Sequence, residues 1–298
     1  MRVDPFYVAV NLSGALDQTQ ATQQQLSQEL SSGLRVSTIG TDPVAAAQNV
    51  TLLNSVDQDD SFTQTTSLTQ GQLQVTDSTL GSVVTQLNQA LSLADAANNG
   101  TLNSTDLKSI SNQLSGIRDE VLSLANTAYQ GVYLFGGSQT SGAPFTLDSS
   151  TSPATVTYNG NSDVNTLVAP TGQSIQLNIP GNQVFTAATA NVLGTLNSLV
   201  ADYANGTAGS GVADTTALNS ALNYVSQQRV TIDNSIGQLT DASGAATEQG
   251  TQLTTVQTDL MQADFASVST QYSLAQSQQT ALISVITALG QGSLFDKL

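Results

Sequence analysis

The sequence contains no histidine, no cysteine and no tryptophan. Histidine is the commonest general base and metal ligand among the side chains, so its absence removes much of the usual chemistry of active sites. Zinc sites of the Cys/His type and catalytic triads that need histidine cannot form. Without cysteine no disulfide can form in any compartment. We therefore assign no catalytic, cofactor-binding or metal-binding residue and predict that the protein is not an enzyme.

Positive charge is also scarce, because 6 Lys and Arg residues stand against 22 Asp and Glu residues in 298, a net charge of −16. The six cations are scattered, whereas nucleic acids and anionic membranes bind clustered cations. We expect neither kind of partner. Charged residues make up 9% of the chain, against about 25% in an average soluble protein. That low charge is either a quirk of composition or the mark of a surface that packs against copies of itself.

Long apolar runs are missing as well. No run approaches the ~18 apolar residues that cross a bilayer, so we expect no membrane insertion. The start of the chain carries Asp4 and Pro5 where a signal peptide would have its apolar core. We expect a protein that is cytoplasmic or is exported without a cleaved signal.

What the sequence does contain is apolar residues at alternating spacings of four and three. The stripes cover Leu12–Leu30, Leu73–Ala94, Leu107–Ala128, Leu218–Leu239 and Met261–Leu289. Spacing near 3.5 residues places one stripe along each helix and favours long coiled-coil seams. We interpret the stripe residues as core. The second helix should end near Gly100, and Ser104 or Thr105 should cap the third.

The pattern changes between about residues 136 and 185, where Gly, Pro, Thr and Val are frequent. Thr155–Tyr158 and Ser174–Ile179 alternate in polarity, and turn signals follow both. The alternation predicts strands of a small β domain of ~50 residues inserted into a helical protein.

We predict a mainly α fold with a β insert, in which N- and C-terminal segments form a long antiparallel coiled-coil bundle. The predicted domains are an N-terminal helix (1–43), two halves of a helical rod (44–137 and 191–250), the β domain (138–190) and a C-terminal helix (251–298).

The two terminal helices contain few charges and few large apolar residues, and Thr19, Gln23 and Gln279 stand on their stripes. Such helices are weakly ordered alone. They either fray, as many termini do, or become ordered when many copies pack together.

Several other residues stand in patterns that bear on special roles. Asp57, Asp59 and Asp60 lack the glycine of a calcium loop and are expected on an exposed helix face. Gly136-Gly137 lacks the lysine of a phosphate loop and should turn the chain from helix to strand. Arg229 occupies a stripe position and should pair with an acidic residue or reach the edge of the core.

The sequence also predicts where four other side chains lie. Tyr129 and Tyr133 are four residues apart and should share one helix face. Lys108 should be solvated at the start of a helix. Arg35 follows Gly33 at a helix end, where a cation suits the exposed carbonyl groups.

Four stretches resemble the flagellin superfamily. They are Glu29–Val36 with Asp42–Ala46, Ala125–Gly137 with Pro144-Phe145, Leu253–Leu289, and Ser293–Leu298. The motif that ends in Phe135-Gly136-Gly137 and the ending Ser293-Leu294-Phe295-Asp296 are similar to the hook-associated protein 3 family. The Leu-Leu-Arg-like ending usual in flagellins is absent. Thr38–Thr41 and Asp4-Pro5 depart from the family's pattern.

The resemblance implies a structural component of the bacterial flagellum, an adaptor at the hook–filament junction. It implies a ring-like layer of copies of the chain, with the terminal helices in an axial core and with a neighbouring hook-associated protein and flagellin as partners. It also implies an extracellular location, type III export without a cleaved signal, and an export chaperone on the C-terminal helix. The near alternative is flagellin, the bulk filament subunit. A distant alternative is a surface enzyme or glycan-binding module on the β insert.

For assembly we single out residues of the terminal helices and their junction. They are Leu12, Leu26, Leu30, Arg35, Phe265, Tyr272, Leu282, Ile286, Leu289, Leu294 and Phe295.

Overall fold

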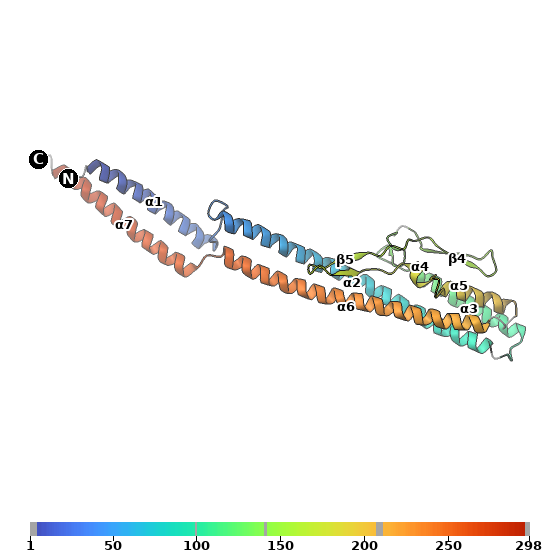
Figure 1. The fold of residues 1–298 in the computed structure, drawn as a ribbon. Coiled ribbons are helices and arrows are strands. Elements are labelled where there is room, and N and C mark those ends of the chain that lie inside the picture. The colour runs from blue at the N-terminus through green and yellow to red at the C-terminus, as the bar shows by residue number, and fades with distance from the viewer. Residues whose placement is uncertain (1–4, 99, 140–141, 207–210, 296–298) are drawn as a thin grey trace. The chain divides into compact units, whose positions relative to one another are not determined.

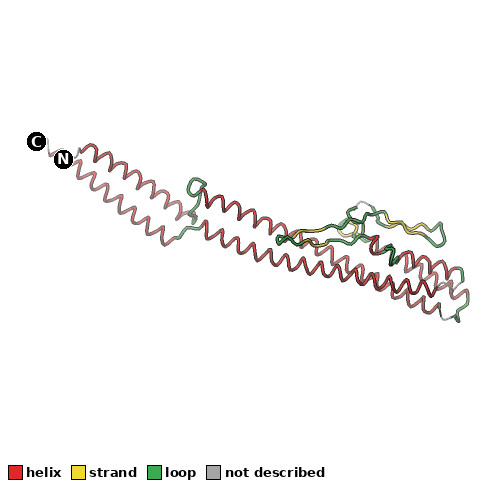
Figure 2. The backbone as a smooth tube through the Cα atoms, viewed as in Figure 1, coloured by secondary structure: helices red, strands yellow, loops and turns green. Residues whose placement is uncertain are grey.

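The computed structural model describes the backbone of residues 5–98, 100–139, 142–206 and 211–295 (Figure 1). Long helices dominate the described chain, and short strands lie between α3 and α4 (Figure 2). The helices are α1 (Pro5–Ser32), α2 (Pro43–Ala97), α3 (Ser104–Ala125), α4 (Gly181–Val184), α5 (Val192–Ala204), α6 (Gly211–Met261) and α7 (Phe265–Phe295). The fold is the predicted helical bundle with a small β insert.

The chain forms two compact units. The terminal unit contains residues 1–58 and 249–298, and the central unit contains residues 59–248. The division falls inside α2 and α6. The predicted functional domains, with limits at residues 43 and 251, stay a prediction.

In the terminal unit, α1 and α7 lie side by side and run antiparallel (Figure 2). Their stripes face each other, and Leu26, Val268 and Ala275 are buried between them. Two helices can bury only the strip of surface along which they touch. The remaining faces of both helices are therefore open.

The predicted C-terminal helix from residue 251 is not continuous, because α6 ends at Met261 and α7 begins at Phe265. Asp264 starts the new helix, since its Oδ1 accepts hydrogen bonds from the backbone N–H groups of Ala266 (3.0 Å) and Ser267 (3.2 Å). Leu34 forms an antiparallel bridge with Gln262 at the same break. A local aspartate cap thus divides an apolar pattern that reads as uninterrupted.

The core of the central unit confirms the stripes. Leu73, Leu80 and Leu87 of α2 are fully buried, and they share one cluster with residues of α3, α5 and α6. Leu114 and Val225 are equally inaccessible. Several helices surround these side chains, so each stripe is covered on both sides.

The cap of α3 differs from the prediction. Asn103, rather than Ser104 or Thr105, is the N-cap, and its Oδ1 accepts from Thr105 N (2.8 Å) and Asp106 N (2.9 Å). The Asp106 carboxylate in turn accepts a hydrogen bond from the backbone N–H of Asn103, which completes a capping box. Because the Asp106 carboxylate stands three residues after Asn103, it favours Asn103 as the N-cap over Ser104 or Thr105.

The insert consists of two-stranded antiparallel hairpins. They are β1 (Ala128–Tyr129) with β2 (Val132–Tyr133), β3 (Phe145–Asp148) with β4 (Thr155–Tyr158), and β5 (Thr166–Val168) with β6 (Ser174–Gln176). The first predicted strand is β4, and β6 covers only the first half of the second.

The expectation that Tyr129 and Tyr133 share a helix face is wrong. They lie in the β1–β2 hairpin, where Gln130 (φ 51°) and Gly131 (φ 83°) supply the left-handed turn. The helix therefore ends before the glycine pair, at Ala125, and Gly136-Gly137 does not make the helix-to-strand turn.

Aromatic side chains anchor the insert to the core. The ring centroid of Phe185 lies 5.0 Å from that of Phe135 and 5.4 Å from that of Phe145, both edge-to-face. The Tyr158 hydroxyl donates to the carbonyl oxygen of Phe135 at 2.9 Å. Hairpins this short need such packing, because isolated two-stranded sheets are marginal in water.

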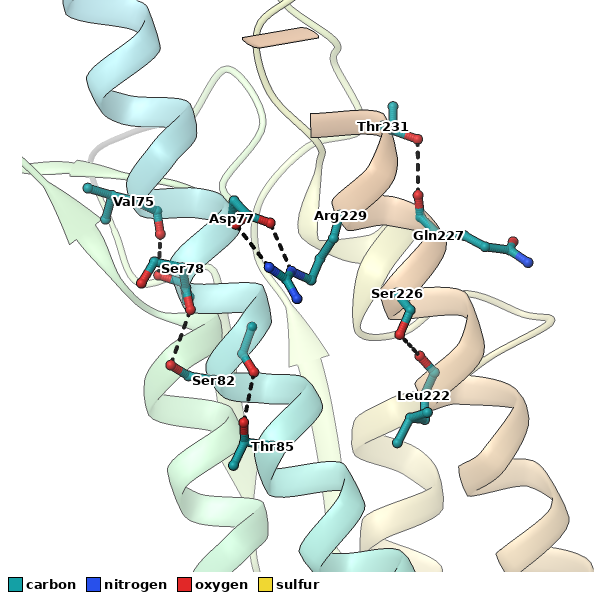
Figure 3. A network of polar contacts seen from close by, with 12 residues as sticks. Val75, Asp77, Ser78, Ser82, Thr85, Leu222, Ser226, Gln227, Arg229 and Thr231 are labelled. Atoms are coloured by element: carbon teal, nitrogen blue, oxygen red, sulfur yellow. Dashed lines mark hydrogen bonds and ion pairs between the residues drawn. The ribbon is translucent and has the colours of Figure 1, made fainter. Parts of the chain in front are cut away.

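Arg229 has the acidic partner that its stripe position predicts (Figure 3). Its Nε and Nη2 donate to the two carboxylate oxygens of Asp77 at 2.8 and 3.0 Å. A Cβ on Gly81 would lie 3.4 Å from the guanidinium carbon, so this glycine leaves room for the planar group. The bidentate pair fixes the register of α2 against α6.

Asp59 contradicts the expected exposed acidic face, because only 3% of its surface is accessible. Its Oδ2 is buried and has no hydrogen-bond partner. Burial, with a smaller contribution from Asp60, raises the pKa of the Asp59 carboxyl.

A double-mutant cycle tests the register pair. We expect Asp77→Asn and Arg229→Gln each to lower the free energy of unfolding. Their coupling energy should be about 1 kcal/mol, because the pair is bidentate but only partly buried. Urea denaturation of the four proteins gives this value. A coupling energy indistinguishable from zero would contradict a register role.

The buried carboxyl gives a pH-dependent prediction. At pH 7 the ionised Asp59 carboxylate costs the folded state free energy, so Asp59→Asn should stabilise the protein by about 1 kcal/mol. The advantage should shrink as the pH falls through the raised pKa, and it should vanish below the ordinary value of 3.8, where the acid is protonated in both states. Urea denaturation across this pH range measures it. The exposed Asp60→Asn is the matched control and should show no comparable gain.

Candidate assembly interface

The structure places the proposed assembly residues in the terminal unit. Leu26 is buried in the α1–α7 seam. Partly buried positions continue the seam along both helices, at Leu12, Leu30, Tyr272, Leu282 and Ile286. The two terminal stripes thus meet within one chain, and a role in contacts between chains stays a prediction for these residues.

Three proposed residues cannot be placed in this way. Leu289, Leu294 and Phe295 belong to the backbone of α7, but their side chains lie outside the described residues.

Phe265 stands on the predicted stripe but is not in the seam, because 50% of its surface is exposed. Its ring lies beside Gly33, where a Cβ would approach to 3.6 Å. Phe265, Leu34 and Met261 line a groove of about 550 Å³ together with polar neighbours from α2 and from the ends of α1 and α6. The first turn of α7 therefore presents its aromatic ring at the surface.

Arg35 joins three segments of the terminal unit. Its Nη1 pairs with the Asp42 carboxylate at 3.1 Å, and its Nη2 donates to the carbonyl oxygen of Leu260 at 2.9 Å. Asp42 Oδ1 also accepts from Ala45 N at 3.0 Å, at the start of α2. The Arg35 side chain thus donates a hydrogen bond to a backbone carbonyl group at the end of α6. The sequence alone suggests an interaction with the end of the helix that precedes Gly33.

The same contacts act on the Asp42 carboxyl. The hydrogen bond from Ala45 and then the bond from the Arg35 guanidinium lower its pKa below the ordinary 3.8. The ion pair is therefore intact at neutral pH. Arg35 thus connects the start of α2 with the end of α6, next to the backbone bridge between Leu34 and Gln262.

Sequence reasoning missed the residues that carry the open surface. Among the described residues, 12 of the 18 exposed large apolar side chains lie in the terminal unit. They are Tyr7, Val10, Leu34, Ile39, Val44, Val50, Leu53, Val256, Phe265, Leu274, Ile283 and Val285. One pattern in the sequence could have indicated this surface: the terminal helices carry little charge and have apolar residues outside their stripes.

No group of three or more acidic residues within the described ranges has the arrangement of a metal site. None of the helices described is long and apolar enough to cross a membrane.

Removal of the Arg35 side chain tests its positioning role. We expect Arg35→Gln to speed backbone hydrogen exchange roughly two- to tenfold at the end of α6 and the start of α2, because both ends lose a polar partner. Hydrogen exchange of the full chain measures this. Lys108→Gln, an exposed change on α3, is the control. Equal exchange at both helix ends in the parent and Arg35→Gln would show that the contact is incidental.

Comparisons with known proteins agree with this architecture. The family model of the bacterial flagellin N-terminal helical region matches residues 4–140. Flagellar hook-associated protein 3 of Salmonella typhimurium is 31% identical over 184 residues, which span 61% of this chain and 56% of that protein. Flagellar hook-associated protein 3 of Escherichia coli is 25% identical over 303 residues, which span 96% of this chain and 95% of that protein.

Solved structures show the same fold. A putative flagellar hook-associated protein from Vibrio parahaemolyticus has a TM-score of 0.64 at 21% identity, covering 74% of this chain and 100% of that one. The FlgL protein of Bacillus cereus has a TM-score of 0.58 at 21% identity, covering 70% and 99%. The chain is thus similar to flagellar hook-associated protein 3 over nearly its whole length, its N-terminal part matches the flagellin N-terminal helical region, and these solved structures share its fold.

Proposed function

We propose that the protein is a structural adaptor of the bacterial flagellum at the hook–filament junction. Its terminal helices would assemble by coaxial packing with those of neighbouring subunits. The observation that carries this proposal is the open apolar surface of the terminal unit. The names of the relatives support the location.

The terminal unit buries too little of its apolar surface by itself. Among the described residues, its buried apolar side chains are Leu26, Val36, Ala45, Ala263, Val268 and Ala275, whereas Val44, Ile39 and Tyr7 are each more than 60% exposed. Exposed apolar surface on this scale is typical of a protein interaction site. A monomer would leave it in water, and packing between copies would cover it.

Low charge makes such packing feasible. α7 contains 31 residues and none of them is charged. A charge buried at an interface needs a partner to offset its desolvation. A helix without charges can enter a subunit interface without that cost.

The proposed partners follow from position in the assembly. They are copies of the chain in a ring-like layer, a neighbouring hook-associated protein on one side and flagellin on the other. Before assembly, an export chaperone on the C-terminal helix would cover part of the apolar surface. We propose an extracellular location on the flagellum, reached by type III export without a cleaved signal. The scattered cations support no nucleic-acid role.

Flagellin remains the second candidate, because the flagellin N-terminal region matches residues 4–140. The two functions differ in copy number and in position along the filament. Antibody against residues 138–190 distinguishes them on intact flagella by immunogold microscopy. Label at one spot where the hook meets the filament would support the junction role, and label along the filament would support flagellin.

Truncation tests the assembly mechanism. A chain that ends at residue 252 lacks α7 and the end of α6. We expect its loss from isolated flagella and loss of motility, because the terminal seam cannot form. The Phe145–Tyr158 contact in the insert should persist, as judged by their NMR signals.

The full-length Val168→Ser variant is the control, since it removes an exposed apolar side chain from the insert. It should be incorporated normally. Motile cells that carry only the truncated protein would overturn the assembly mechanism.

A further inference from the structure

The groove at the start of α7 is bordered by exposed apolar side chains. Leu34 (40% exposed) and Phe265 (50% exposed) flank it, and Met261 contributes to its wall. The other lining residues are Ser32, Gly33, Asn49, Gln257, Thr258 and Gln262. None of the lining side chains is charged, so the groove suits an uncharged apolar occupant.

A matching surface lies further along α7. Leu274, Gln278, Ala281 and Val285 follow the spacing i, i+4, i+7 and i+11, which places them on one face of the helix. All four are exposed, and Leu274 and Val285 keep 58% and 46% of their surfaces open. This face, the α7 flank, borders the seam with α1 but is not buried in it. Gln278, Ala281 and Val285 line a hollow beside Thr19 of α1, whereas Val268 and Ala275 belong to the buried seam cluster.

Charge narrows the choice of occupant. The chain carries a net charge of −16, so two copies repel unless their contact surfaces avoid charge. Among the described helices longer than one turn, every one except α7 contains at least one acidic side chain. The α7 flank is thus a helical surface of a second copy that can enter the groove without burying a carboxylate.

The flank cannot fill the groove of its own chain. Val285 lies 20 residues beyond Phe265 on one continuous helix, which corresponds to about 30 Å. The occupant must therefore come from another copy.

We propose that the groove beside Leu34 and Phe265 receives the α7 flank of a second copy. The inference rests on the proposed function, since it names the contact by which terminal units join. Groove and flank are different surfaces, so each copy offers one and receives the other. Such a heterologous contact continues from copy to copy and builds a ring or an open helical array.

Cysteine cross-linking tests the contact, because the parent chain has no cysteine and introduced thiols are the only ones. The test variant is Leu34→Cys with Val285→Cys, and the matched control is Leu34→Cys with Val230→Cys. Val230 is 57% exposed and lies on α6 in the central unit. The gene for each double variant replaces the gene for the parent chain in the source bacterium. Intact flagella are then isolated and mildly oxidised.

We expect the test variant to give a ladder of covalent dimers and higher multimers, and the control to give at least tenfold less. A single Leu34→Cys variant should stay monomeric on a denaturing gel. A ladder of equal intensity from the control, or no ladder from the test variant in motile cells with the protein in their flagella, would overturn the inference and leave the proposed function standing. Absence of both the parent and the variant from isolated flagella would instead overturn the proposed function and the inference with it.

Discussion

The single seam between α1 and α7 is the constraint on which the terminal unit depends. A two-helix contact buries one stripe on each helix and leaves the other faces in water. In this unit the buried core is thin, since alanine supplies three of the six buried apolar side chains among the described residues, and Gln23 and Gln279 occupy seam positions. Stability of such helices must come from packing against something else. The apolar residues off the seam then have a physical purpose that a monomeric protein would not need.

The central unit uses the same heptad spacing with the opposite outcome. There Leu80, Leu114 and Leu218 are completely buried, because neighbouring helices cover each stripe from more than one side. The Asp77–Arg229 pair interrupts the apolar stripes of α2 and α6 at one level. A paired polar interruption of this kind specifies register, which pure leucine packing leaves less well defined. One sequence period thus produces a self-sufficient core in one unit and an incomplete one in the other.

The stripes and β4 could be predicted from the sequence because they depend on local periodicity. Asp59 could not, since its burial depends on which side chains lie opposite it, and the spacing of Asp57, Asp59 and Asp60 carries no such information. The Tyr129–Tyr133 hairpin was missed because a spacing of four also suits a helix, and the left-handed turn at Gln130-Gly131 has only one glycine to signal it. Phe265 was placed in the seam because the stripe continues through it, whereas the Asp264 cap redirects the chain just before it. The open surface of the terminal unit was least accessible to prediction, since exposure is a property of the whole fold.

The low overall charge admits two readings from composition alone, and the structure separates them. A compositional quirk would thin out charges evenly, with no relation to where apolar side chains are exposed. Instead α7, which has no charged residue, also carries exposed Leu274, Ile283 and Val285. Exposed apolar side chains and an absence of charge thus occur together on the same helix. Either property alone would not indicate an interface. Together they are the properties of a surface that exchanges water for another protein surface, since apolar burial then stabilises the contact and no carboxylate must be desolvated.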